Sequence, residues 1–182
     1  MDKEITNGDS CNTMNLSFPN HSGTHVDLPS HFNGKGKTLT DYPAEFWEFN
    51  QVTLVDLSGF VSESEIITPQ MFSSLRNRDT ELLLIKTGFG LFRGTDTYTL
   101  TPPGLSSELA TFFREKFPAL RCVGMDLISI SSYSNREEGR KAHHEFLNPK
   151  KGQPILLIED MKLDVNDSFK KVIVAPLLIE NA

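Results

Sequence analysis

Short apolar runs recur along the 182-residue chain, separated by polar and glycine-containing turns. Their residues are mostly β-branched or leucine, which is typical of strands. Because the apolar character is nearly continuous within each run, we expect both faces of these strands to be covered. The predicted strands lie near residues 51–57, 81–87, 120–130, 154–159 and 171–179.

Three stretches between the predicted strands have the features of helices. "TPQMFSSL" offers Thr68 as an N-cap and Pro69 at the first helical position. "REEGRKAHHEFL" is a second candidate, interrupted by Gly139. In "GLSSELATFFREKF", large apolar side chains share roughly one face: Leu105, Leu109, Phe112, Phe113 and Phe117. Strands that alternate with helices predict an α/β domain, here a mixed sheet with flanking helices.

Composition narrows the possible classes of protein. A chain of 182 residues suits a single domain, spanning 1–182. The net charge of −6, without a basic run, argues against a nucleic-acid partner. The apolar runs are too short to cross a bilayer, and the acidic start shows no secretory signal. Cys11 and Cys122 stand in unrelated contexts, which favours free thiols in a reducing cytoplasm.

Three of the five histidines fall within residues 21–31, "HSGTHVDLPSH". In an extended backbone alternate side chains share a face, and four polar side chains here have the same parity: His21, His25, Asp27 and His31. The same alternation points Val26 and Leu28 toward the core. The alternative is a surface loop in which Asp27 caps a turn.

A straight strand could not bring this whole segment to one ion. Ten extended residues span about 33 Å, whereas metal–ligand bonds are about 2.0–2.2 Å long. We therefore expect bends at Gly23 and Pro29. Imidazole and carboxylate ligands suit Zn²⁺, Mn²⁺ or Fe²⁺, and zinc is the first expectation. Because no thiolate is present, an open catalytic site is favoured over a closed structural one.

Two later stretches could complete such a site. Glu159 ends the apolar run "PILLIE", and a carboxylate is costly to bury there unless it is paired or bound to a metal. His143 and His144 are the remaining histidines, and either could be a ligand or a surface residue. Asp126 could cap a neighbouring loop or contact a substrate, and we favour the structural role. The aromatic side chains of "AEFWEF", residues 44–49, favour core packing over a substrate wall.

The pattern H-x-G-T-H-x-D-x-P-x-H of residues 21–31 resembles the signature of the metal-dependent cyclase family, which includes bacterial kynurenine formamidase and isatin hydrolase. "VGMDLISIS", "EGRKAHHEFL" and "ILLIEDMKL" resemble the second half of that family. The resemblance covers the chain from about residue 15 onward. It implies a swivelling β/β/α fold, a homodimer or homotetramer, and one or two Zn²⁺ ions, or Mn²⁺ in some members.

The resemblance also implies roles for individual residues. Metal ligands match at five positions, with His144 as the alternate for His143: His21, His25, Asp27, His143 and Glu159. His31 matches the catalytic histidine. Only twenty residues precede His21, whereas family members usually have a longer stretch with a strand and substrate-contacting residues, so we expect a short N-terminal region that bears on the integrity of the substrate pocket or of the oligomer.

The sequence thus predicts a cytoplasmic metal-dependent hydrolase of a small amide, lactam or lactone. Water would be activated by the metal, and His31 would transfer the proton, since an imidazole pKa near 6.5 suits both directions. Arylformamide hydrolysis would release formate and place the protein in tryptophan catabolism. The alternatives are an isatin-hydrolase-like lactam hydrolase and a shortened, non-catalytic metal-binding relative. A serine hydrolase has little support, because no G-x-S-x-G motif is present.

Overall fold

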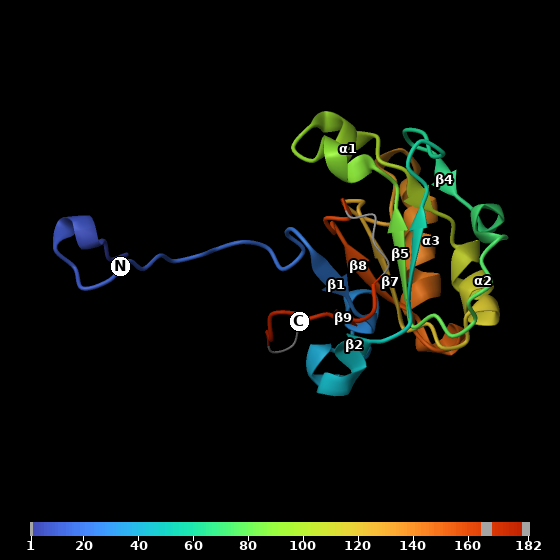
Figure 1. Ribbon diagram of the computed structural model, residues 1–182, viewed down its shortest axis with the longest axis horizontal. Coiled ribbons are helices and arrows are strands. Elements are labelled where there is room, and N and C mark those ends of the chain that lie inside the picture. Colours follow the sequence, from blue (N-terminus) through green and yellow to red (C-terminus); the bar gives the residue numbers. More distant parts are fainter. Residues whose placement is uncertain (1, 165–168, 180–182) are drawn as a thin grey trace.

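A five-stranded mixed sheet forms the centre of the protein in a computed structural model that describes residues 2–164 and 169–179. Its strand order is β1–β8–β7–β5–β3 (Figure 1). Four neighbouring strands run parallel, and β1 pairs antiparallel with β8 at one edge. The strands are β1 (His25–Asp27), β3 (Val52–Asp56), β5 (Leu82–Lys86), β7 (Cys122–Met125) and β8 (Leu156–Glu159).

Smaller elements surround this sheet. Two short strand pairs are antiparallel β2 (Glu48–Phe49) with β9 (Val172–Ile173), and parallel β4 (Ile66–Ile67) with β6 (Gly104–Leu105). The α-helices are α1 (Asp96–Leu100), α2 (Glu108–Lys116) and α3 (Arg136–Leu147). Single 3-10 turns lie at Ile5–Asn7, Pro29–His31, Leu39–Asp41, Ala44–Trp47, Pro69–Phe72, Phe89–Phe92, Tyr133–Asn135 and Pro149–Lys151. The predicted α/β class, a mixed sheet with flanking helices, is confirmed.

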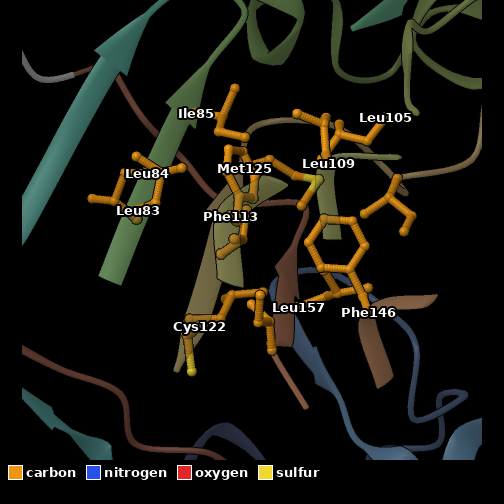
Figure 2. Close-up of a cluster of buried hydrophobic side chains, with 14 of the residues drawn as sticks. Leu83, Leu84, Ile85, Leu105, Leu109, Phe113, Cys122, Met125, Phe146 and Leu157 are labelled. Carbon is orange, nitrogen blue, oxygen red and sulfur yellow. The ribbon is translucent and has the colours of Figure 1, made fainter. Parts of the chain in front are cut away.

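The inner strands β5, β7 and β8 are buried almost throughout, as their sequences predict, whereas the edge strand β3 is only partly buried. In β5, the four residues from Leu82 to Ile85 are at most 1% exposed. α2 and α3 lie on the same side of the sheet (Figure 1). The two helices contact each other through the rings of Phe113 in α2 and Phe146 in α3, whose centroids lie 6.2 Å apart. Both residues belong to the buried cluster drawn in Figure 2. Phe49 and Trp47 are also buried, which confirms that "AEFWEF" packs into the core.

Some expected elements are wrong or shorter than predicted. A strand over 171–179 forms only at Val172–Ile173, and Leu177 and Leu178 beyond it are exposed, because an apolar run extends a sheet only where a partner strand lies beside it. The helix expected after Thr68 is one 3-10 turn, and the Thr68 side chain makes no capping hydrogen bond. Leu105 belongs to β6 rather than to the face of α2.

Asp126 holds the turn that follows β5. Its buried carboxylate accepts hydrogen bonds from the N–H and hydroxyl of Thr87, both at 2.7 Å, and from the N–H of Gly88 at 2.9 Å. Gly88 has φ of +83°, a left-handed conformation that suits glycine. The interpretation of Asp126 as a loop cap is confirmed. β7 ends at Met125, the residue before Asp126, and is shorter than expected.

The chain that precedes the histidine-rich segment extends away from the body of the protein (Figure 1). The side chains are exposed throughout residues 2–24, including those of Met14, Leu16 and Phe18. Within the described ranges, none of the helices is long and apolar enough to cross a membrane.

Candidate metal centre

The histidine-rich segment follows the predicted bent path. Gly23 adopts a left-handed conformation with φ of +65°, and the chain then enters β1 at His25. Pro29 begins a 3-10 turn that ends at His31. Between the bends, Leu28 is buried and Val26 packs against the core. The bends therefore occur where the glycine and the proline predicted them.

Asp27 lies at the middle of the converging side chains and is 1% exposed. Its Oδ1 lies 3.1 Å from Nδ1 of His21 and 3.5 Å from Nε2 of His25. Its Oδ2 lies 3.4 Å from Nε2 of His143, which comes from α3. Burial alone would raise the pKa of Asp27, but its interaction with His143 and the charges of the surrounding histidines outweigh burial and lower that pKa.

Glu159 reaches the same centre from the end of β8. The antiparallel register of β1 and β8 places Glu159 directly opposite His25. Its Oε2 lies 3.5 Å from Nε2 of His25, and its Oε1 lies 3.5 Å from Nε2 of His143. Oε1 also accepts a hydrogen bond of 2.8 Å from the N–H of Ile130. The carboxylate is thereby fixed in a buried position facing two imidazoles.

The two adjacent histidines of α3 point in different directions. The Nδ1 of His143 lies 2.9 Å from the carbonyl oxygen of Gly139, which leaves Nε2 directed at the two carboxylates. The Nε2 of His144 instead lies 3.2 Å from the side-chain amide of Asn148. Of the two candidates left open by the sequence, the geometry therefore brings His143 into the centre.

The two carboxylates favour the form of His143 that carries a second ring proton. Burial would lower its pKa, but its interactions with Asp27 and Glu159 raise that pKa to about 10. A divalent cation between the carboxylates and the imidazole would supply the positive charge that this proton supplies, and its binding would release the proton.

His31 lies at the open side of the cluster. The centroid of its ring is 4.2 Å from that of His21 and 6.2 Å from that of His143. Phe32 packs edge-on against His31 and stacks on His143. Burial lowers the pKa of His31, Asp27 opposes this effect, and His21 adds to it, so that the pKa lies below 6.5.

The donor set fits a divalent cation. Ligand atoms lie within 4.8 Å of one another in two groups that share Asp27: His21, Asp27 and His31, and His25, Asp27 and Glu159. Oδ1 of Asp27 is buried and has no hydrogen-bond partner among the described residues, although two imidazole nitrogens lie within 3.5 Å. A buried carboxylate oxygen that accepts no hydrogen bond is costly. Imidazoles and carboxylates without a thiolate are the ligands of open zinc or manganese sites.

Two contacts of the centre were missed by the sequence reasoning. The Ser129 hydroxyl and the Ile130 N–H both donate to Oε1 of Glu159. They belong to the irregular stretch after β7, and neither a backbone N–H nor a serine within "ISIS" carries a recognisable motif. The only usable signal was the need of a buried carboxylate for donors.

The fold and the site define an α/β protein with a centre of histidines and carboxylates suited to a divalent cation. The family model described as "Putative cyclase" matches residues 2–132. The chain therefore belongs to the cyclase family, as its histidine motif predicted.

The chain is also similar in sequence to known kynurenine formamidases. Kynurenine formamidase of Bacillus cereus (strain ATCC 10987 / NRS 248) is 29% identical over 174 residues, which cover 95% of this chain and 76% of that protein. The kynurenine formamidase of Bacillus mycoides (strain KBAB4) is 28% identical over 177 residues, 97% of this chain and 78% of that protein. These relatives support an enzyme, a hydrolase of the cyclase family.

Solved structures show the same fold. Isatin hydrolase A from Labrenzia aggregata, bound to benzyl benzoate, has a TM-score of 0.76 at 23% identity and covers 94% of this chain and 73% of that chain. A predicted metal-dependent hydrolase from Bacillus stearothermophilus has a TM-score of 0.65 at 21% identity, over 90% of this chain and 72% of that chain.

Proposed function

We propose that the protein is a metal-dependent hydrolase of a small, non-peptide amide, with arylformamides of the kynurenine formamidase type as the first substrate class. The proposal rests on the buried Oδ1 of Asp27, which accepts no hydrogen bond among the described residues although two imidazole nitrogens lie within 3.5 Å of it. The similarity to kynurenine formamidases over 95% of the chain supports the choice of substrate class.

Five side chains would hold the cation, Zn²⁺ in the first instance or Mn²⁺: His21, His25, Asp27, His143 and Glu159. The two carboxylates match the charge of a divalent ion. Because the donor atoms form two groups that share Asp27, the arrangement would suit one ion or two. Such an ion, when bound, lowers the pKa of water toward about 7 and polarises a substrate carbonyl.

His31 would act as the general base and then as the general acid. Its depressed pKa keeps the imidazole neutral at pH 7, so it can accept a proton from the attacking water. As the new C–O bond forms and the C–N bond breaks, the same imidazole returns that proton to the leaving nitrogen. An aryl formamide would thereby yield formate and an arylamine. Phe32, which contacts the His31 ring and is partly exposed, lies where it can pack against an aromatic substrate.

A small substrate panel tests this proposal. We expect zinc-loaded protein to release formate from N-formylkynurenine or a simple aryl formamide, at a rate at least 100-fold above that of an Asp27→Asn variant measured in parallel. Formate can be measured with a coupled dehydrogenase and the arylamine by absorbance. Turnover of isatin alone would instead identify a lactam hydrolase. Absence of turnover across the panel, with metal loading verified, would contradict the proposal and favour a non-catalytic metal-binding protein.

A further inference from the structure

Asp160, the residue after Glu159, is held by side chains from a distant part of the chain. Nε of Arg93 donates a hydrogen bond of 2.9 Å to its Oδ1, and Nη2 of Arg93 donates to the same oxygen. The hydroxyl of Tyr98, in α1, also donates to this oxygen. Nη2 of Arg93 lies 3.3 Å from the Tyr98 hydroxyl, so the two donors also contact each other. One carboxylate oxygen therefore accepts three hydrogen bonds from a single cluster.

The backbone at Asp160 is fixed as well. Its φ of +53° lies in the left-handed region, which residues other than glycine seldom adopt and which persists only where surrounding contacts impose it. Its N–H donates to the carbonyl oxygen of Leu127 at 2.7 Å. Its own carbonyl oxygen accepts from Nη2 of Arg93 at 3.1 Å and from the hydroxyl of Thr24 at 2.7 Å.

These contacts join the two strands that carry the candidate ligands. Thr24 immediately precedes His25 in β1, and Asp160 immediately follows Glu159 in β8. His25 and Glu159 face each other in the register of the two strands, and their side chains lie 3.5 Å apart. Nη2 of Arg93 also donates a hydrogen bond of 3.2 Å to the carbonyl oxygen of Met161, the residue after Asp160. The direction of the Glu159 side chain therefore depends on a backbone turn that Arg93 and Tyr98 help to hold.

We propose that Arg93 and Tyr98 are positioning residues for the metal centre. By holding Asp160 in its left-handed conformation, they fix the angle at which Glu159 leaves β8 and keep its carboxylate opposite His25. This inference rests on the proposed function, since it assumes that Glu159 and His25 bind a cation. Arginine suits the role because two nitrogens of its planar fork donate to the side-chain and backbone oxygens of Asp160 in a fixed geometry, whereas a lysine offers a single ammonium nitrogen.

The test is the affinity of metal-free protein for Zn²⁺, measured by competition with a chromophoric chelator. Residues that orient metal ligands typically contribute 10–100-fold to affinity. We expect Arg93→Gln to weaken Zn²⁺ binding by about that factor, and Tyr98→Phe, which removes one donor, to weaken it less. Arg93→Lys should recover part of the loss. Arg136→Gln is the matched control, because Arg136 also packs over a tyrosine ring, that of Tyr133, and we expect it to bind Zn²⁺ like wild type.

Thermal unfolding of each metal-free variant separates positioning from general stability. A lowered unfolding midpoint with unchanged Zn²⁺ affinity in Arg93→Gln and Tyr98→Phe would overturn the inference, because it would show a purely structural role. If Arg93→Gln does not fold, Tyr98→Phe decides the matter by the same criterion. Failure of wild-type protein to bind Zn²⁺ would overturn the proposed metal centre itself, an outcome distinct from equal affinities in wild type and variants.

Discussion

Asp27→Asn is expected to abolish stable metal binding and to reduce hydrolysis to the background rate. The carboxylate is 1% exposed, and its two oxygens face three imidazoles. Asparagine has nearly the same shape but lacks the negative charge. It also has only one oxygen that can bind a cation, whereas Asp27 contributes to both groups of ligand atoms. The expected loss of metal affinity exceeds the 10–100-fold that loss of a residue orienting a ligand costs.

Metal content after dialysis, together with the rate of formate release, measures this effect. Asp164→Asn is the matched control, because that exposed carboxylate pairs with Lys162 and the same chemical change there should leave both quantities at the wild-type level. An Asp27→Asn protein that retains bound metal and activity would show that the centre lies elsewhere.

Replacing His31 with asparagine should separate catalysis from metal binding. General acid–base catalysis contributes about 10²–10⁴-fold to rate, so we expect kcat to fall by about that factor. His31 lies at the edge of the cluster, while Asp27 and Glu159 hold the buried positions. Metal content should therefore change little, although Asp27, His21 and His31 form one of the two donor groups.

The pH profile provides a second reading of the same residue. Since the pKa of His31 is lowered below 6.5, wild-type activity should be present above that pKa and be lost as the pH falls through it. In His31→Asn this acid limb should disappear. His144→Asn, which alters a histidine directed at Asn148, should keep both the rate and the acid limb. A variant at His31 with wild-type kcat would exclude it as the acid–base group.

Local features of the centre could be predicted from sequence because they depend on neighbouring residues. Alternation placed His25 and Asp27 on one side, and the conformational preferences of Gly23 and Pro29 located the two bends. The buried strands could also be predicted, because a short, continuous apolar run such as "LLLI" is typical of a strand covered on both faces.

Long-range features could not be predicted in the same way. The residues alone left His143 and His144 open, because the choice depends on which face α3 turns toward the sheet; only the family resemblance favoured His143. The register that sets Glu159 opposite His25 comes from pairing across more than a hundred residues. Arg93 carries no sequence signal at all, since its role arises only where its turn meets the end of β8. The apolar residues at 174–179 were wrongly predicted to continue a strand, because a strand also needs a neighbouring strand to pair with, and the local sequence does not reveal one.

Reconstitution of metal-stripped protein tests whether hydrolysis depends on the metal centre. Protein freed of metal with a chelator would be titrated with Zn²⁺, and bound zinc and formate release from N-formylkynurenine would be followed together. We expect negligible activity before zinc is added, and a rate that rises in proportion to bound zinc until one or two ions per chain are held. Full activity in the stripped protein, or saturation with zinc without any hydrolysis, would contradict this expectation.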